Sequence, residues 1–228
     1  MTSRQDEAQI IEVFSSIQGE GLYVGRRQVF VRFAGCNLEC RFCDTPRTES
    51  NPVSVERLNQ IVNDLAKAAR HHSISLTGGE PLLHAEFIRR WLLTRSGGPD
   101  VHVETNGTLP DALEKVIGLV DVTAMDIKLP SASGQPARYD ENLHVLPVAA
   151  QREVFVKVVF TDATPDDELA EVVRIVSRVN HAIPTVLQPV SGAGCPRPAR
   201  VLSAHAFVSK GLANVLVIPQ THKMLGCM

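Results

Sequence analysis

The sequence lacks the long apolar runs and the charge excess that mark several large classes of protein. No stretch among its 228 residues approaches the ~20 consecutive apolar residues of a membrane-spanning helix. Lysines and arginines number 23 against 25 aspartates and glutamates, and the net charge of −2 gives no sign of a nucleic-acid-binding surface. Residues 1–7 are polar and charged, unlike a secretory signal. We therefore expect a cytoplasmic protein with neither a membrane nor a nucleic acid as its partner.

The sequence also has no linker, internal repeat or low-complexity tract. Hydrophobic residues make up 44% of the chain, which is typical of a globular protein rather than a disordered one. A chain of this length can bury one sizeable core. We expect a single domain that spans residues 1–228.

Cysteine is scarce and unevenly distributed. The five cysteines are an odd number, and three of them lie within eight residues. This pattern does not suit a disulfide framework, but it suits a reducing compartment. Cys195 and Cys227 lie far from the other three and are interpreted as ordinary thiols.

Cys36, Cys40 and Cys43 are the feature with the clearest chemistry. They follow the spacing C-x3-C-x2-C, and Phe42 precedes the last of them. Thiolates select iron–sulfur clusters, zinc or Cu(I), and a closed zinc or cluster site usually takes four protein ligands. Three ligands on one loop would leave one iron of a four-iron cluster open to a small molecule. From the spacing alone, a zinc knuckle and three unrelated thiols stay open as alternatives.

Predicted strands alternate with predicted helices along most of the chain. Strands are expected at residues 28–34, 73–77, 101–104, 122–127, 154–160, 185–188 and 214–218, and helices at 54–70, 85–94, 109–119, from 164 onward and at 198–210. This alternation implies parallel β-α units. The strands are too few for a full eight-fold barrel. We expect an α/β fold built as a partial, open TIM-like barrel.

Local signals add further expectations. Residues 10–14 are predicted to be an edge strand or an extended lead-in, and residues 131–146 a long connection. Ser54 and Thr164 are predicted helix caps, with Pro165 at the first helical position. His71 and His72, at the end of the first helix, are interpreted as cap or surface residues.

A second motif follows the next predicted strand. Gly78-Gly79-Glu80-Pro81 lies one β-α unit after the cysteines, and together the two motifs resemble those of the radical S-adenosylmethionine (SAM) enzymes. The resemblance implies a [4Fe-4S] cluster on Cys36, Cys40 and Cys43 whose open iron holds SAM. It also implies that the turn contacts the amino group of SAM, for which the Glu80 carboxylate could be an acceptor.

Two further segments narrow the resemblance. Ser16 to Gly21, then a strand, the cysteines and Asp44-Thr45 are similar to the 7-carboxy-7-deazaguanine synthases, and so is the closing Gln220 to Gly226. Members of that family contract the ring of 6-carboxy-5,6,7,8-tetrahydropterin to 7-carboxy-7-deazaguanine with loss of ammonia, a step toward deazapurines such as queuosine.

The resemblance implies roles for individual residues. The pterin substrate is expected to meet Ile17, Gln18, Gly19, Arg32 and Thr77, with Arg32 on its carboxylate. SAM is expected to meet Phe42, Cys43, Asp44, Gly79, Glu80, Asp126, Lys128, Gln188 and Pro189. Thr45 corresponds to the family's Mg²⁺ ligand. A homodimer and an electron donor such as flavodoxin or ferredoxin are implied in the same way.

The sequence departs from the family pattern at three places and leaves alternatives open. Asp126-Ile127-Lys128, Val190-Ser191 and the closing Cys227-Met228 differ from familiar members, which puts those contacts in doubt. Glu104, at a strand end, suits either a ligand contact or an ordinary acid. An activating enzyme for a glycyl-radical protein and a non-catalytic iron–sulfur or zinc protein are the competing functions.

Overall fold

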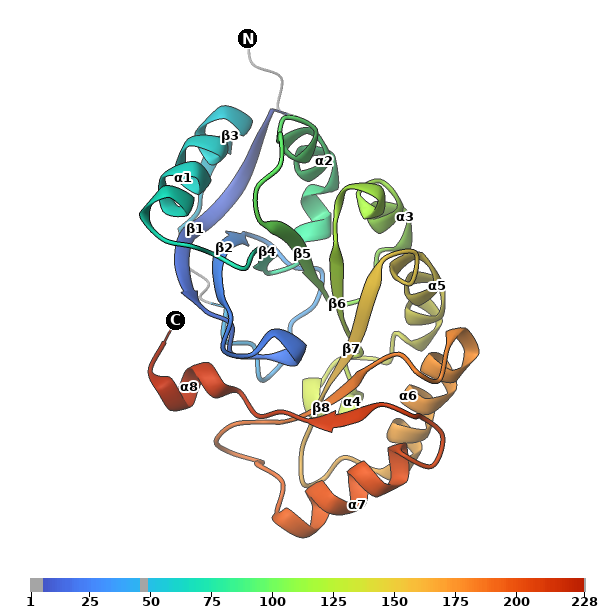
Figure 1. The fold of residues 1–228 in the computed structure, drawn as a ribbon. Coiled ribbons are helices and arrows are strands. Elements are labelled where there is room, and N and C mark those ends of the chain that lie inside the picture. The colour runs from blue at the N-terminus through green and yellow to red at the C-terminus, as the bar shows by residue number, and fades with distance from the viewer. Residues whose placement is uncertain (1–5, 46–48, 228) are drawn as a thin grey trace.

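The computed structural model describes residues 6–45 and 49–227. Within these residues the strands form one open sheet in the order β3-β1-β2-β4-β5-β6-β7-β8-β9 (Figure 1). Neighbours from β2 to β9 run parallel, whereas β1 is antiparallel to both β2 and β3. The predicted open α/β sheet of parallel units is confirmed. The strands are β1 Glu7–Ile17, β2 Arg27–Phe33, β3 Asn51–Ser54, β4 Ser73–Gly78, β5 Asp100–Thr105, β6 Val122–Asp126, β7 Glu153–Phe160, β8 Thr185–Pro189 and β9 Val215–Val217.

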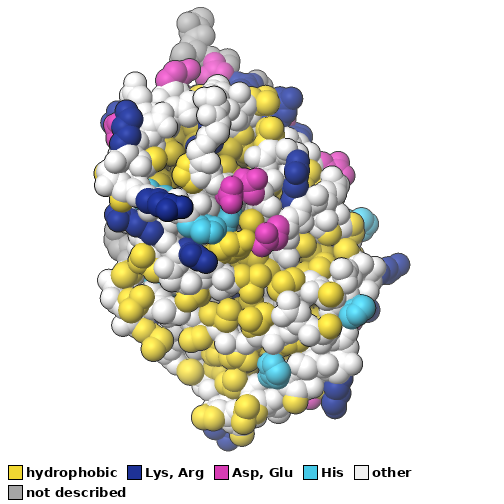
Figure 2. All heavy atoms as spheres, in the orientation of Figure 1, with side chains coloured by type: hydrophobic (Ala, Val, Ile, Leu, Met, Phe, Trp, Pro, Cys, Tyr) yellow, Lys and Arg dark blue, Asp and Glu magenta, His cyan; other side chains and the backbone are white. Residues whose placement is uncertain are grey.

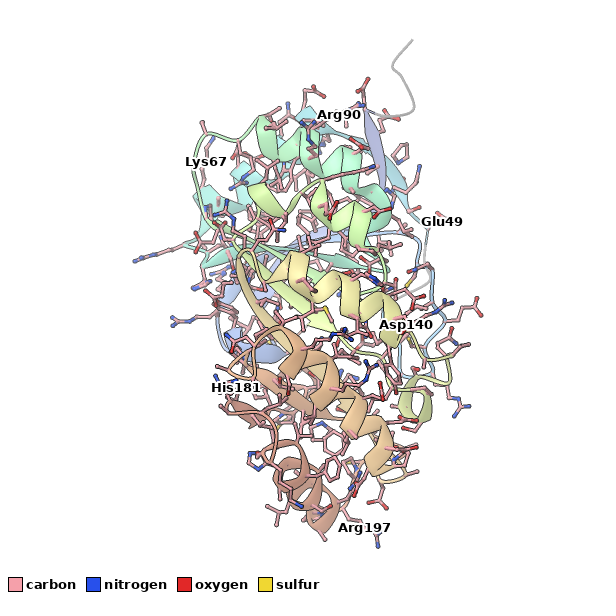
Figure 3. The ribbon with its side chains drawn as sticks, turned by 90° about the vertical axis from the view of Figure 1, so that its right-hand side faces the viewer. Glu49, Lys67, Arg90, Asp140, His181 and Arg197 are labelled. Carbon is pink, nitrogen blue, oxygen red and sulfur yellow. The ribbon has the colours of Figure 1, made fainter. Side chains whose placement is uncertain are left out.

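The helices lie mostly on the outer side of the curved sheet (Figures 1 and 3). They are α1 Val55–Ala68, α2 Ala85–Leu93, α3 Pro110–Glu114, α4 Pro130–Ser133, α5 Tyr139–Ala149, α6 Asp166–Val179, α7 Pro198–Val208 and α8 Thr221–Leu225, with short 3₁₀ turns η1 Gly21–Tyr23, η2 Pro81–His84 and η3 Ile117–Leu119. Charged side chains such as Asp140 project outward from this layer in Figure 3.

The two faces of the sheet differ because side chains alternate along a strand. In β2, Val29, Val31 and Phe33 are fully buried in the main core against the helices. Gln28 and Arg32 alternate with them and face the inner side of the arc. Burying one large aliphatic or aromatic side chain stabilises the fold by about 1.5–3 kcal/mol, so the outer layer carries most of the stability. The inner face is left for polar groups.

Helix α1 shows how the sequence fixes an element locally. Ser54 lies at its N-cap and its Oγ accepts a hydrogen bond from the Arg57 backbone N at 3.3 Å, which confirms the predicted cap. Leu58 and Val62 fall one turn apart and are buried against the sheet. A turn connects α1 to β4, and the last residue of β4 is Gly78, the first residue of the Gly78-Gly79-Glu80-Pro81 motif.

One prediction about the elements holds in part and another is wrong. Residues 10–14 lie in a strand as predicted, but β1 is longer, and β3 pairs with its Glu7–Ile10 part, where Pro52 is tolerated at the edge of the sheet. Residues 131–146 are not an extended connection, because they contain the end of α4 and most of α5. Asp140 and Glu141 in the first turn of α5 suit a helix N-terminus, whereas Pro147 in its last turn obscures the pattern.

Two predictions about single residues also need correction. Thr164 does not cap α6; Pro165 occupies the N-cap position, and the Thr164 Oγ1 accepts a hydrogen bond from the Thr161 backbone N at 3.0 Å instead. His71 is neither a cap nor a surface residue. It is buried, and its Nε2 lies 2.8 Å from the Ser15 Oγ on β1.

Candidate functional site

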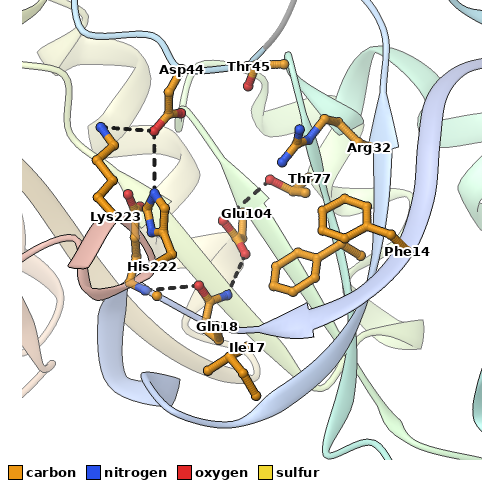
Figure 4. Close-up of a pocket in the computed structure, with 13 residues that line it drawn as sticks. Phe14, Ile17, Gln18, Arg32, Asp44, Thr45, Thr77, Glu104, His222 and Lys223 are labelled. Carbon is orange, nitrogen blue, oxygen red and sulfur yellow. Dashed lines mark hydrogen bonds and ion pairs between the residues drawn. The ribbon is translucent and has the colours of Figure 1, made fainter. Parts of the chain in front are cut away.

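Two adjoining pockets occupy the inner face at the carboxyl ends of the parallel strands. The first, here the arginine pocket, has a volume of about 270 Å³ and is lined by all five residues predicted to bind substrate, Ile17, Gln18, Gly19, Arg32 and Thr77 (Figure 4). The second, here the cysteine pocket, has a volume of about 140 Å³ and is lined by the three clustered cysteines with Phe42, Asp44, Gly79, Asp126, Lys128 and Gln188. Residues that line both pockets are Glu20, Asp44, Thr45, Thr77 and Glu104.

The cysteine loop follows directly from β2. Gly35 has a φ of +83°, a conformation that favours glycine, and it turns the chain out of the strand. Cys36 and Cys43 are exposed and Cys40 is half-buried. The loop is anchored where the Arg41 backbone N donates to the Ser133 carbonyl at 2.8 Å. Three thiols are thus presented to one pocket on a short, anchored loop.

The spread of the three sulfurs bears on which group they could hold. Among the described residues, Glu20, Asp44 and His222 form a set whose ligand atoms all lie within 4.8 Å of one another, but the three cysteines do not form such a set. Zinc–sulfur bonds are about 2.3 Å long, so sulfurs sharing one zinc lie within about 4.6 Å of each other.

The Gly79 turn packs against the cysteine loop at backbone distance. A Cβ on Gly79 would lie 1.8 Å from the Gly35 carbonyl oxygen, so no other residue fits there without a shift of the backbone. The Glu80 backbone N donates to the same carbonyl at 2.8 Å. The two motifs are therefore joined directly.

The Glu80 side chain points into the protein. Its carboxylate is fully buried and accepts hydrogen bonds from the backbone N of Leu82 at 3.1 Å, the Thr105 Oγ1 at 2.9 Å and the Asn106 backbone N at 2.7 Å. Burial raises the pKa of Glu80 to about 7, against the lowering effect of these donors. The acceptor predicted for the SAM amino group is satisfied by the chain itself.

The segment that follows β5 is hydrogen-bonded to the cysteine loop. The Asn106 Nδ2 donates to the Asn37 Oδ1 at 2.8 Å and lies 3.9 Å from the Cys36 Sγ. The Thr108 Oγ1 donates to the Asn106 Oδ1 at 2.6 Å and accepts from the Asn37 Nδ2 at 2.8 Å. This ring of hydrogen bonds, which sequence reasoning missed, fixes the first cysteine relative to β5.

The floor of the cysteine pocket carries paired charges. The Lys128 Nζ donates to the Asp126 Oδ2 at 2.9 Å and lies 5.2 Å from the centroid of the Phe42 ring. The Asp126 Oδ1 and the Gln188 Oε1 are buried and have no hydrogen-bond partner among the residues that the structure describes. Buried acceptors are rarely left unpaired, so the pocket has acceptors ready for hydrogen-bond donors of a ligand.

Arg32 lies in the wall of the arginine pocket. Its Nη1 donates to the Glu12 Oε1 at 2.5 Å, and its guanidinium lies 5.1 Å from the centroid of the Phe14 ring. Only 19% of the Arg32 side chain is exposed. Phe14 stacks on Phe30 with 5.2 Å between ring centroids. The arginine is thus not an ordinary surface charge.

Gln18 and Glu104 form the polar floor of the arginine pocket (Figure 4). The Gln18 Nε2 donates to the Glu104 Oε1 at 2.9 Å, and the Gln18 Oε1 accepts from the Glu20 backbone N at 3.0 Å. The Ser75 Oγ also donates to the Glu104 Oε1 at 2.6 Å. Glu104, whose role the sequence left open, belongs to both pockets.

Thr45 and the C-terminal segment border the mouth of the arginine pocket. The Thr45 Oγ1 donates to the Gly78 carbonyl at 2.9 Å. Asp44 lies 3.3 Å from the Lys223 Nζ and 3.7 Å from the His222 Nε2 (Figure 4). His222 and Lys223, known from the sequence only as part of a family signature, therefore reach the site through α8.

A few predicted contacts fall outside the two pockets. Glu80, Pro189 and Ser191 line neither of them. Cys195 is exposed and also lines neither pocket. Met228 lies outside the described residues. Sequence reasoning missed Lys157, which lines the cysteine pocket and whose only signal was a lysine in an otherwise apolar strand.

Comparisons with known proteins agree with this arrangement. A family model of the radical SAM superfamily matches residues 30–139. The 7-carboxy-7-deazaguanine synthases of Geobacter sulfurreducens and Methanothermobacter thermautotrophicus are each 40% identical, over 96% of this chain and 97% of theirs. The crystal structure of QueE from Escherichia coli shares the fold, with a TM-score of 0.62 and 18% identity over 97% of this chain and 100% of that one. No described helix is both long enough and apolar enough to cross a membrane.

Proposed function

Because this chain belongs to the 7-carboxy-7-deazaguanine synthase family of radical SAM enzymes, we propose that its two pockets divide the reaction between them. The reaction is the ring contraction of 6-carboxy-5,6,7,8-tetrahydropterin to 7-carboxy-7-deazaguanine with loss of ammonia. In this proposal the cysteine pocket takes a [4Fe-4S] cluster and SAM, and the arginine pocket takes the pterin. The main support is that all the residues expected for the pterin line one pocket and most of those expected for SAM line the adjoining one, with Asp44 and Thr77 shared by both.

The cysteine pocket fits the cofactors that the family implies. Cys36, Cys40 and Cys43 supply three thiolates for the cluster, whose open iron suits the amino and carboxylate groups of SAM. When bound, the cluster and SAM supply the electron and the 5′-deoxyadenosyl radical that removes a hydrogen atom from the substrate. The unpaired acceptors on Asp126 and Gln188 suit the hydroxyl, amine or ammonium donors that SAM carries.

The arginine pocket fits a flat heterocycle that bears a carboxylate. Arg32 offers a guanidinium that is only partly used by Glu12, so its remaining donors can bind the substrate carboxylate. Phe14 and Phe30 offer an apolar wall to a planar ring. Glu104 and the backbone around Gln18 offer acceptors and donors to the edge of the pterin. These groups orient the substrate toward the shared wall of the two pockets.

Thr45 is the proposed Mg²⁺ ligand. Its hydroxyl hydrogen is used by the Gly78 carbonyl, which leaves the oxygen lone pairs for a hard cation. Mg²⁺ keeps several waters, so one protein oxygen suffices when the substrate supplies others. Thr45 lines both pockets, which places such an ion next to both ligands.

The remaining proposals concern partners and location. The exposed Cys36 and Cys43 leave the cluster loop accessible to a protein electron donor such as flavodoxin or ferredoxin. We expect a homodimer that works in the cytoplasm as a single radical SAM domain. The relatives reported above favour the synthase over a glycyl-radical activating enzyme or a non-catalytic iron–sulfur or zinc protein.

An anaerobic assay tests the proposed function. The protein is reconstituted with iron and sulfide, then mixed with 6-carboxytetrahydropterin, SAM, reductant and Mg²⁺, and 7-carboxy-7-deazaguanine is measured by mass spectrometry. Cys40→Ala should lose the brown chromophore and turnover, whereas the matched Cys195→Ala should keep both. Absence of the product from a fully reconstituted sample would reject the substrate, and loss of the cluster in Cys195→Ala would reject the ligand assignment.

A further inference from the structure

A buried lysine stands in the wall of the cysteine pocket. Lys157 lies in the middle of β7 between Val156 and Val158, and only 9% of its side chain is exposed. Burying an ammonium costs several kcal/mol unless the ion is paired and hydrogen-bonded. Lys157 must therefore be stabilised at this buried position by ionic and hydrogen-bonding partners.

Two carboxylates face Lys157. Its Nζ donates to the Glu20 Oε2 and lies 3.4 Å from the Asp126 Oδ2, which also accepts from Lys128 at 2.9 Å. The four side chains alternate in charge and sum to zero. Burial alone would lower the pKa of Lys157, but Asp126 and Glu20 raise it, so the ammonium stays charged at neutral pH.

The other oxygen of Glu20 joins distant parts of the chain. The Glu20 Oε1 accepts hydrogen bonds from the Gln188 Nε2 at 3.0 Å and from the Gln220 Nε2 at 2.7 Å. Gln188 is at the end of β8, and Gln220 directly precedes α8. The Gln220 Oε1 in turn accepts from the Lys223 Nζ at 2.8 Å. Lys157 thus fixes one oxygen of a carboxylate whose other oxygen holds the C-terminal segment.

We propose that Lys157 is a positioning residue, which fixes the Glu20 carboxylate so that Gln220 keeps α8 docked over the arginine pocket. Without the ammonium, Lys128 would be the one cation left for both Asp126 and Glu20 in this network, and because Lys128 is bonded to Asp126, the Glu20 carboxylate would turn toward water. The Gln220 amide would then lose its shorter hydrogen bond and keep the longer one, to the Asp44 Oδ2 at 3.4 Å. Because α8 has no buried residue of its own, its docking would weaken. The consequence for catalysis rests on the proposed function, because it assumes that the arginine pocket binds the pterin.

Hydrogen exchange of the protein without substrate tests the proposal directly. In Lys157→Met, the peptide covering residues 219–227 should exchange about ten- to a hundredfold faster, since a hydrogen bond to a charged group is lost. Peptides of β5 should keep their wild-type rates. Lys115→Met, which breaks a surface pair with Glu86, is the matched control and should leave residues 219–227 unchanged.

A double variant separates positioning from a direct role. Lys157→Met with Glu20→Gln removes one charge of each sign, and the Gln side chain still offers an oxygen to both amides. In this double variant, residues 219–227 should exchange as slowly as in the wild type. If Lys157→Met fails to fold, the exchange rate of the double variant is the measurement that tests the proposal. Unchanged exchange in the single variant, or fast exchange in the double variant, would overturn the proposal.

A kinetic measurement completes the experiment. Lys157→Met should raise the KM for 6-carboxytetrahydropterin more than it lowers kcat, and the double variant should recover the KM. If the pterin were not the substrate, the kinetic measurement would show no turnover in any variant, whereas hydrogen exchange would still report on the docking of α8. The two failures are therefore distinguishable.

Discussion

Arg32 illustrates how a single residue gains its meaning from the fold. In the sequence it is one cation in a predicted strand, and only the family resemblance gives it a role. The structure turns it inward, next to Phe14 and Glu12, in the wall of a pocket.

Replacing Arg32 should therefore weaken substrate binding selectively. Losing a charge-assisted pair with a carboxylate inside a site costs roughly 2–5 kcal/mol. Arg32→Ala should raise the KM for 6-carboxytetrahydropterin strongly and leave SAM binding unchanged, as measured by steady-state kinetics and SAM titration. Glu12→Gln is the control, because it frees the guanidinium without removing it. An unchanged pterin KM in Arg32→Ala would assign the arginine to structure alone.

Thr45 makes a prediction about metal dependence. If its oxygen binds Mg²⁺, Thr45→Val should blunt the rise in turnover on adding magnesium while the cluster and SAM cleavage stay intact. Valine keeps the branched shape and removes the oxygen. A misplacement of about 1 Å can cost about a hundredfold in rate, so the effect should be large. Full stimulation of Thr45→Val by magnesium would mean that Thr45 does not bind the metal and that its hydroxyl serves only the hydrogen bond to the Gly78 carbonyl.

Glu20 makes a prediction about pH. Burial alone would raise the pKa of this carboxyl, but Lys157 outweighs burial and lowers the pKa to about 2. A lowered folded-state pKa means that the ionised group stabilises the fold above its ordinary pKa, near 4.5, and that this contribution disappears as the pH falls toward 2.

The stability difference between wild type and Glu20→Gln should therefore be largest at pH 6–7 and shrink below about pH 4.5. Urea unfolding of the metal-free protein at several pH values measures it. Glu114→Gln, at an exposed site on α3, is the control and should show no such trend. A difference that is constant with pH would mean that Glu20 is not held ionised by Lys157.

At the scale of elements, the helices and strands that could be predicted are those with a regular spacing of apolar residues. Helix α1 and its cap at Ser54 were predicted because Leu58 and Val62 repeat on one face next to a clear start signal. Helix α5 was missed because Pro147, which lies inside its last turn, is a residue that usually ends a helix. A second reason is that the polar Asn142 is buried, since its side chain donates to the Gly107 carbonyl at 2.7 Å. β3 was missed because four residues that include Pro52 have no strand pattern of their own. Only the pairing with β1 explains them.

The site divides in a similar way. The motifs located both pockets, because loops at the carboxyl ends of neighbouring parallel strands lie at the same edge of the sheet. Lys157 and Asn106 could not be placed, because their neighbours come from strands far away in the chain. The intrachain partners of Glu80 could not be foreseen, since no pattern tells whether a carboxylate turns toward a ligand or toward its own backbone. The contact of Glu80 with SAM stays a prediction.

Docking of α8 makes a prediction at this scale. The Thr221 backbone N donates to the Gly19 carbonyl at 2.9 Å, and a Cβ on Gly19 would lie 2.3 Å from the His222 Nδ1. Gly19→Ala should therefore push α8 away and raise the pterin KM, with little change in Tm because α8 buries no residue. Gly118→Ala, where a Cβ meets open space, is the matched control. Wild-type kinetics in Gly19→Ala would show that α8 does not shape the pocket.

At the scale of the whole molecule, the apolar surface is unevenly distributed. Figure 2 shows apolar side chains gathered over the lower part of one face, the region of β8, β9 and α7 in Figure 1. Leu216 and Ile218 are only partly buried there, and β9 ends the sheet with no described strand on its outer side. Such an edge is usually covered.

We expect a second copy of the chain to cover this region in the homodimer. Light scattering after size exclusion should give twice the mass of one chain. Leu216→Asp should shift the protein toward the monomer, whereas Leu93→Asp, at an exposed site on α2, should not. A monomeric wild-type protein, or a dimer untouched by Leu216→Asp, would contradict this placement of the interface.

The contact between Gly79 and Gly35 has a consequence for how such sequences change over evolutionary time. Gly79 is constrained by the neighbouring carbonyl oxygen and Glu80 by three donors of its own chain, so both residues serve the framework whatever ligand is bound. The thiols of Cys36 and Cys43 are exposed, and neither residue belongs to the buried core. A descendant that lost the chemistry would be free to lose these cysteines while selection for folding retained the glycine and the glutamate. Among distant relatives, the Gly-Gly-Glu-Pro turn is therefore a marker of ancestry, and the cysteines are the marker of activity.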